Sequence, residues 1–177
     1  MFLYLAMIDS DADKSKFEIL YNEYKNLMYY TANRILRNSS DAEDVVHQAF
    51  LKVIEILDTI SSPRCHKTRA LLVTITEHKA IDLYREKQRR NVLPLAEEYI
   101  GAAPAAEIER LAARDTLAAA IASLPPRYRS VLLLRYDCGY SNAEIANILD
   151  TTEPNVRKLI QRAKEKLSAK LRGTEEP

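Results

Sequence analysis

The fold of this chain is decided by the stretch Ser141-Asn142-Ala143-Glu144-Ile145-Ala146. Ser141 followed three residues later by Glu144 is a capping box, in which the hydroxyl accepts a backbone N–H of the first turn and the carboxylate reaches back to the serine N–H. We therefore expect a helix to begin at Asn142. Its apolar positions recur at helical spacing, namely Ile145, Ala146, Ile148 and Leu149.

A second helix is expected a few residues further on, over residues 153–171. Asp150 stands where the chain must leave the first helix, and Asp tolerates the left-handed conformation that such a place requires. Thr152 is a residue type that caps helices, and Pro154 is tolerated in a first turn. The apolar stripe of this second helix consists of Val156, Leu159, Ile160, Ala163 and Leu167.

The remaining face of the second helix is basic. Two helices joined by a short turn, the second of them positively charged, form the helix-turn-helix motif that binds DNA. Arg, Gln and Asn side chains can bind base edges, while Lys and Arg also bind phosphates. The candidates on this helix are Asn155, Arg157, Lys158, Gln161 and Arg162. A solvated basic surface helix is the plainer alternative, and the capped helix directly before it argues against that alternative.

The composition of the 177 residues favours an all-α protein of one or two domains. Only 3 residues are Gly, and no strong alternating β pattern is present. The net charge of +1 conceals a basic block over residues 61–95 and another over 127–177, with acidic segments before and between them. Two basic segments fit two-point contact with a long polyanion.

No cofactor is expected, because neither the two cysteines nor the three histidines stand at metal-ligand spacing. The apolar segment 1–7 is too short to span a membrane, so we expect a cytoplasmic protein with free thiols.

The rest of the chain shows helices separated by clear breaks. Helices are expected over residues 14–37, from a capping box of Ser40 and Glu43 to about residue 57, over 68–90, and over 107–122. Pro94, Gly101 and Pro104 indicate a flexible linker. The sequence therefore predicts a domain at 1–90, a linker at 91–106 and a helix-turn-helix domain at 107–177.

Taken together, the chain resembles the sigma-70 family of bacterial transcription initiation factors, in particular its compact ECF (extracytoplasmic function) class. Three motifs carry the resemblance over residues 14–172: Asp41-Ala42-Glu43-Asp44-Val45-Val46-His47-Gln48-Ala49-Phe50, then Ala80-Ile81-Asp82-Leu83-Tyr84-Arg85, then the stretch 124–171. The resemblance implies two helical domains, sigma domains 2 and 4, that bind core RNA polymerase through the β′ clamp helices and the β flap. It also implies binding to promoter DNA near −10 and −35 and no catalysis. An anti-sigma factor, common in this class, is a further partner that the resemblance raises.

The resemblance also assigns candidate sites. For polymerase contact these are Asp41, Asp44, His47 and Gln48. Near the −10 element they are Lys67, His78, Lys79, Arg85, Arg89 and Arg90. Residues 155–162, already singled out, would contact the −35 element. The chain departs from the family at Leu71, where Trp is frequent, and at His78, where Asn is frequent. We therefore expect it to prefer a −10 sequence of its own.

Other classes of protein fit less well. A helix-turn-helix regulator that acts without polymerase would carry the same recognition helix, but it would need a ligand-binding or dimerisation domain in place of the acidic and basic helices of residues 1–90. An enzyme finds little support, because the histidines and cysteines form no catalytic motif. An all-α adaptor would show no affinity for DNA.

Overall fold

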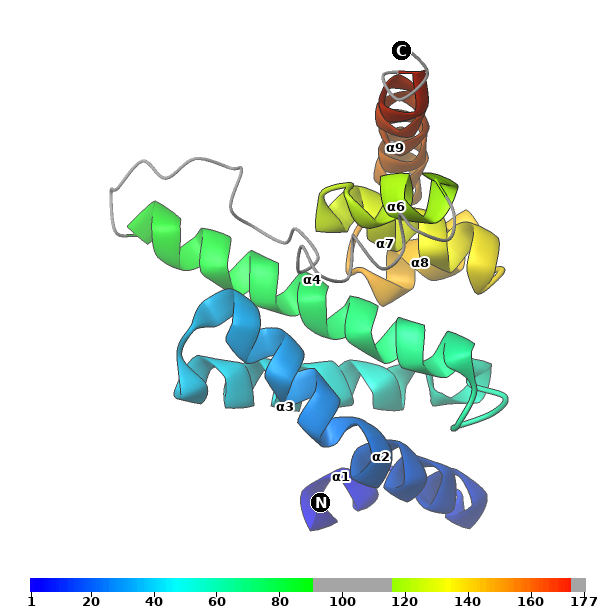
Figure 1. Ribbon diagram of the computed structural model, residues 1–177. Coiled ribbons are helices and arrows are strands. Elements are labelled where there is room, and N and C mark those ends of the chain that lie inside the picture. Colours follow the sequence, from blue (N-terminus) through cyan, green and yellow to red (C-terminus); the bar gives the residue numbers. More distant parts are fainter. Residues whose placement is uncertain (91–115, 173–177) are drawn as a thin grey trace. The chain divides into compact units, whose positions relative to one another are not determined.

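The computed structural model describes residues 1–90 and 116–172 of the chain. Every regular element in these two ranges is helical, which confirms the all-α prediction (Figure 1). The chain divides into two compact units, residues 1–95 and 96–177. The predicted linker, 91–106, lies outside the described residues, so the predicted domain boundaries stay a prediction.

Unit 1 is a bundle of three long helices that all contact one another, α2, α3 and α4 (Figure 1). Its elements are α1 (Phe2–Leu5), α2 (Asp11–Leu36), α3 (Ser39–Glu55), the 3₁₀ turn η1 (Leu57–Thr59) and α4 (His66–Arg90). The core of this bundle combines side chains from all three long helices. The side chains of Phe17, Leu20, Met28, Phe50 and Leu72 are fully buried.

The junction between α2 and α3 differs from the prediction. The predicted capping box of Ser40 and Glu43 was wrong, because both residues lie inside α3 and the N-cap is Asn38, whose side chain accepts the N–H of Asp41 at 3.0 Å. The cause is Arg37, which takes a left-handed conformation (φ 51°) and turns the chain at once. The next helix therefore begins earlier than predicted, because the side-chain amide of Asn38 is as good a cap as a serine hydroxyl.

Two other helix starts in unit 1 are also earlier than predicted, and one helix of this unit was missed. Helix α2 begins at Asp11, because Ser10 caps it by accepting the N–H of Asp13. Helix α4 begins at His66, where the Cys65 sulfur accepts the N–H of Thr68 at 3.4 Å. The short helix α1 was not predicted.

In the described part of unit 2, three short helices pack against one long helix, α9. Its described elements are α6 (Thr116–Ala122), α7 (Pro126–Leu132), the π-helical turn η3 (Leu133–Asp137), α8 (Asn142–Ile148) and α9 (Glu153–Arg172). The core side chains Val131, Leu134, Ile145, Val156 and Ala163 are completely buried. Of the predicted helix 107–122, residues 107–115 lie outside the described part of the chain.

Candidate nucleic-acid and protein interfaces

The helix-turn-helix in unit 2 has the predicted local geometry. Ser141 Oγ accepts the N–H of Glu144 at 3.2 Å, and the Glu144 carboxylate accepts the N–H of Ser141 at 2.7 Å. Hydrogen bonds to the Glu144 carboxyl, first from the Ser141 side chain and then from the Ser141 backbone N–H, hold its pKa below the ordinary value. Asp150 ends the turn in the left-handed region with φ 48°. The capping box, the start of α8 at Asn142 and the left-handed Asp150 are therefore confirmed.

The five candidate residues on α9 share an exposed face. Val156 and Ala163 are 0% exposed and hold the other side of α9 against unit 2. One turn of a helix takes 3.6 residues, so side chains at 157, 158, 161 and 162 project opposite the buried pair. All five are exposed, namely Asn155, Arg157, Lys158, Gln161 and Arg162.

Three of these five side chains already have partners within α9 or its preceding turn. Asn155 Nδ2 donates to Thr151 Oγ1 at 2.8 Å, Arg157 pairs with Glu153 at 2.5 Å, and Gln161 Nε2 donates to Glu165 Oε1 at 3.1 Å. Such exposed i,i+4 contacts are weak and exchange readily for a ligand. Lys158 and Arg162 form no ion pair with any residue in the described ranges, so their charges are the most available to DNA.

A hollow beside this face was missed by sequence reasoning. Its lining combines η3, α8 and α9, namely Arg135, Tyr136, Asn142, Arg157, Ile160, Gln161 and Lys164. Tyr136 is 60% exposed, and the Lys164 ammonium lies 5.3 Å from the centre of its ring. Arg135 donates to the carbonyl of Tyr140 at 3.0 Å. The adjacent Arg-Tyr pair just before the capping box was the available sequence signal.

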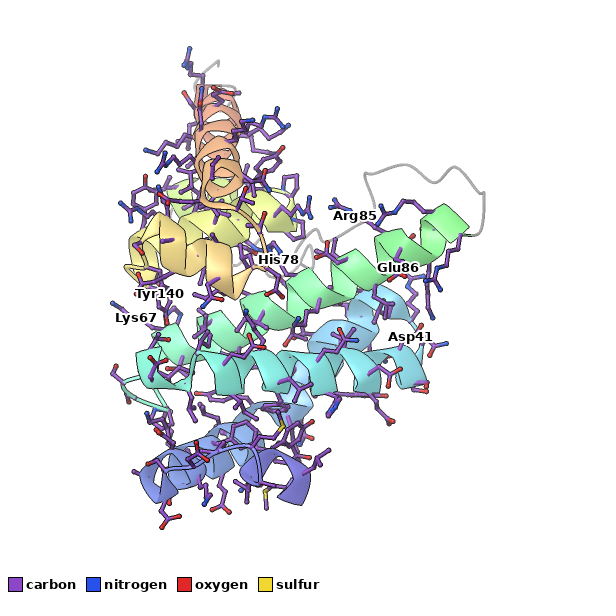
Figure 2. The ribbon with its side chains drawn as sticks, turned by 180° about the vertical axis from the view of Figure 1, so that it is seen from behind. Asp41, Lys67, His78, Arg85, Glu86 and Tyr140 are labelled. Atoms are coloured by element: carbon purple, nitrogen blue, oxygen red, sulfur yellow. The ribbon has the colours of Figure 1, made fainter. Side chains whose placement is uncertain are left out.

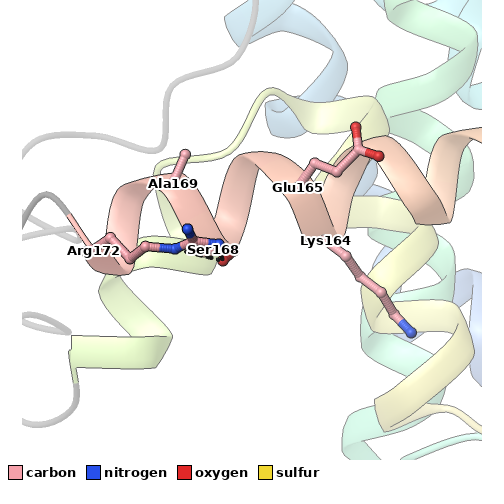
Figure 3. A pocket seen from close by; sticks show the side chains of 5 residues that line it. All are labelled: Lys164, Glu165, Ser168, Ala169 and Arg172. Atoms are coloured by element: carbon pink, nitrogen blue, oxygen red, sulfur yellow. Dashed lines mark hydrogen bonds between the residues drawn. The ribbon is translucent and has the colours of Figure 1, made fainter.

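A second hollow runs along the C-terminal half of α9 (Figure 3). It is lined by Lys164, Glu165, Ser168, Ala169 and Arg172, and the Arg172 guanidinium donates to Ser168 Oγ at 2.9 Å. One helix supplies all of these residues, whereas small-molecule sites enclose most of their ligand. This hollow is therefore a surface groove and not an active-site cleft.

The −10 candidates all lie on α4 but differ in exposure. Lys67, Arg89 and Arg90 are exposed, and Lys79 and Arg85 are half-buried. His78 is buried, with 7% of its surface exposed. Figure 2 labels Lys67, His78 and Arg85 along the helix. The structure thus gathers the cations of this set on one long helix and leaves its histidine covered.

Two acidic residues of α4 belong to ion pairs. Glu77 is 5% exposed and lies 3.4 Å from the Arg34 guanidinium of α2. Glu86 pairs with Arg90 at 2.5 Å near the end of α4. The Glu77 pair links two long helices of unit 1, whereas the Glu86 pair partly offsets the charge of the basic tail.

The polymerase candidates lie in the N-terminal half of α3. Asp44, His47 and Gln48 are exposed. The Asp41 carboxylate instead contacts the Lys87 ammonium of α4 through both oxygens at 2.5 Å (Asp41 is labelled in Figure 2). Sequence reasoning did not foresee this bridge between α3 and α4, because its partners are 46 positions apart.

Metal sites and membrane-crossing helices are both absent from the described residues. Within 1–90 and 116–172, His, Cys, Asp and Glu side chains form no group of three that could hold a metal ion. In those same ranges, no helix has the length and apolar character that crossing a bilayer requires.

Comparison with known proteins finds matches over both units. The family model for sigma-70 region 2 matches residues 20–90, and that for sigma-70 region 4 matches residues 114–167. The chain is 27% identical over 172 residues to the ECF RNA polymerase sigma factor SigW of Bacillus subtilis, covering 90% of this chain and 91% of SigW. It is 29% identical over 148 residues to the ECF sigma factor SigL of Mycobacterium tuberculosis, covering 82% and 83%. Among solved structures, CnrH in complex with the cytosolic domain of CnrY is 27% identical and covers 90% of this chain and 89% of CnrH, with a TM-score of 0.40.

The fold and the exposed face of α9 define a helix-turn-helix protein built to bind DNA. The two family models and the curated relatives place it further: the chain belongs to the sigma-70 family, in its ECF class. It is an initiation factor that works with RNA polymerase to start transcription at specific promoters.

Proposed function

We propose that this ECF sigma factor binds core RNA polymerase through unit 1 and recognises its promoters with one helix from each unit, α4 near −10 and α9 near −35. The observation that carries the proposal is the exposed basic face of α9 behind the capped helix α8. A helix in that position enters the major groove in helix-turn-helix proteins. Its work is binding and not catalysis, and we assign it to the cytoplasm, where core polymerase and DNA are found.

On α9 we assign different roles to the two kinds of side chain. Arg162 and Lys158, which form no ion pair within the described residues, would make the first contacts. Arg157, Gln161 and Asn155 would exchange their present partners for base edges or phosphates. A good bidentate contact to a base discriminates by about 1–3 kcal/mol against the wrong base.

On α4 the cations Lys67, Lys79, Arg85, Arg89 and Arg90 would hold the DNA backbone around the −10 element. His78 would contact an unstacked base, as histidine rings can. Because His78 is 7% exposed, this contact requires that its ring be uncovered when the complex forms.

On α3 the exposed residues Asp44, His47 and Gln48 would contact polymerase at the β′ clamp helices, while unit 2 would contact the β flap. Asp41 would join them only by exchanging Lys87 for a basic group of the polymerase. An anti-sigma factor completes the proposed partners. RpoE, a sigma factor that is 17% identical to this chain, has been solved with the anti-sigma factor NepR from Bartonella quintana.

The proposal is tested by binding of the polymerase complex to a library of genomic fragments. Arg162→Ala should lower the affinity for the selected fragments more than the affinity for random DNA. Arg172→Ala is the matched control, since it removes an exposed arginine from the end of the same helix. An equal loss on all sequences would reduce Arg162 to a phosphate contact. Binding of the free protein to specific sites with no affinity for polymerase would favour the regulator that acts alone.

A further inference from the structure

The short helix α1 is fastened to the bundle by one tyrosine. Tyr4 is 8% exposed, and its ring centre lies 5.4 Å from that of Phe17, 5.9 Å from those of Tyr21 and Phe50, and 5.3 Å from that of His47. Aromatic pairs at such separations stabilise beyond the area they bury. Residues 1–8 are thus held against α2 and α3, beside one of the residues proposed for polymerase contact.

Tyr4 also determines how His47 presents its ring. The Tyr4 hydroxyl lies 2.6 Å from His47 Nδ1. Burial raises the pKa of the Tyr4 phenol, so this hydroxyl stays protonated and forms one hydrogen bond with Nδ1. The bond fixes the orientation of the His47 ring. Because His47 is exposed, the edge of its ring that carries Nε2 is available to a partner in a defined position.

Exposed apolar side chains gather around this anchor. Leu3 is 68% exposed, Met7 56% and Met1 42%. Over residues 1–90 and 116–172, six large apolar or aromatic side chains are exposed, and three of these belong to the first seven residues. Leu3 precedes Tyr4 directly, and Met7 follows it by about one helical turn.

We propose that residues 1–8 and the exposed face of α3 form one continuous docking surface for core RNA polymerase, in which Tyr4 positions His47 while Leu3 and Met7 supply the apolar contact. This inference rests on the proposed docking of polymerase at α3. The residues of α3 assigned to that docking are all polar or charged. Binding energy at protein interfaces comes mostly from desolvated apolar and aromatic anchors inside a polar rim.

Core polymerase is the partner that this surface favours, because the apolar segment is continuous with the proposed polymerase site on α3. The hydrogen bond between Tyr4 and His47 joins the apolar segment to α3, so a partner that covers His47 also meets residues next to Tyr4. The neighbouring exposed carboxylates, Glu43 and Asp44 on α3, favour a partner surface that combines basic and apolar groups.

The test measures the affinity of the full-length protein for core polymerase. The double variant Leu3→Ser/Met7→Ser should bind about tenfold more weakly or worse, since the loss of even a modest apolar contact is worth a factor of ten. Tyr30→Ser is the matched control, because Tyr30 is 65% exposed on α2 of the same unit. Thermal unfolding should be unchanged in both variants, because all three side chains are exposed.

A second variant tests the positioning role. Tyr4→Phe keeps the ring in its cluster and removes one hydrogen bond, so it should weaken polymerase binding about fivefold. In a His47→Ala background the same change should have no further effect, since the bond no longer exists. An effect that persists without His47 would overturn the positioning role.

The outcomes also separate this inference from the function on which it rests. Wild-type affinity in the Leu3/Met7 variant, together with weaker binding in Asp44→Ala and Gln48→Ala, would overturn the inference alone. Unchanged affinity in all of these variants would remove α3 as the docking site, and the proposed function would fail with it.

Discussion

Replacing Ser141 with Ala should destabilise unit 2 and leave unit 1 unchanged. The change removes the hydroxyl that accepts the Glu144 N–H and also relaxes the return bond from the carboxylate to the Ser141 N–H, now 2.7 Å long. Loss of a helix N-cap costs about 1 kcal/mol. For a unit of this size, that lowers the melting temperature by about 4–8 °C.

The assay is scanning calorimetry of the full chain, with Glu144→Ala and the double variant alongside. The two single changes should be strongly non-additive, because each breaks the same reciprocal pair of bonds. A control variant, Ser40→Ala, should have almost no effect, since Ser40 is exposed inside α3 and does not cap it. Additive losses, or an unchanged melting temperature for Ser141→Ala, would refute the reasoning.

The stability lost in Ser141→Ala should also depend on pH, in a direction that follows from the pKa of Glu144. The pKa of Glu144 in the folded protein is lowered, so its stabilising contribution is present above the pKa of the unfolded chain and is lost as pH falls through the folded pKa. The stability difference between the wild type and Ser141→Ala should therefore shrink on acidification. An NMR titration of the Glu144 carboxyl should show its pKa rising in the variant.

Two further predictions concern unit 1. Phe50→Ala should destabilise that unit by about 3–5 kcal/mol, because Phe50 is 0% exposed and its ring packs on those of Tyr4, Phe17 and Tyr21. Denaturant unfolding measures this, and a loss below about 1 kcal/mol would contradict the packing. Cys65 should react with iodoacetamide at a lower pH than an ordinary thiol, because hydrogen bonds from Thr68 lower its pKa. Its rate profile should move to higher pH in Thr68→Val, and an unchanged profile would exclude this cause.

Local signals explain why the helix-turn-helix could be predicted residue by residue. The capping box depends on two residues three positions apart, and the left-handed turn depends on Asp150 alone. Neither feature depends on contacts with residues distant in the sequence. The same reasoning failed at the start of α3, where Asn38 and Ser40 are both good caps and the left-handed Arg37 made the choice.

Contacts between distant residues could not be predicted in this way. Tyr4 meets His47 across 43 positions, and Asp41 meets Lys87 across 46. Such pairings depend on how the helices pack, which periodicity alone does not specify. The sequence thus identified α3, α4 and α9 as candidate interfaces, while packing decided that Asp41 is engaged with Lys87 and that His78 is covered.

The most direct test of the central claim is transcription from genomic DNA by core RNA polymerase with and without the purified protein. The account predicts transcript starts that appear only with the protein and that share two spaced upstream motifs. Starts that are the same with and without the protein, together with no binding to core polymerase, would contradict it.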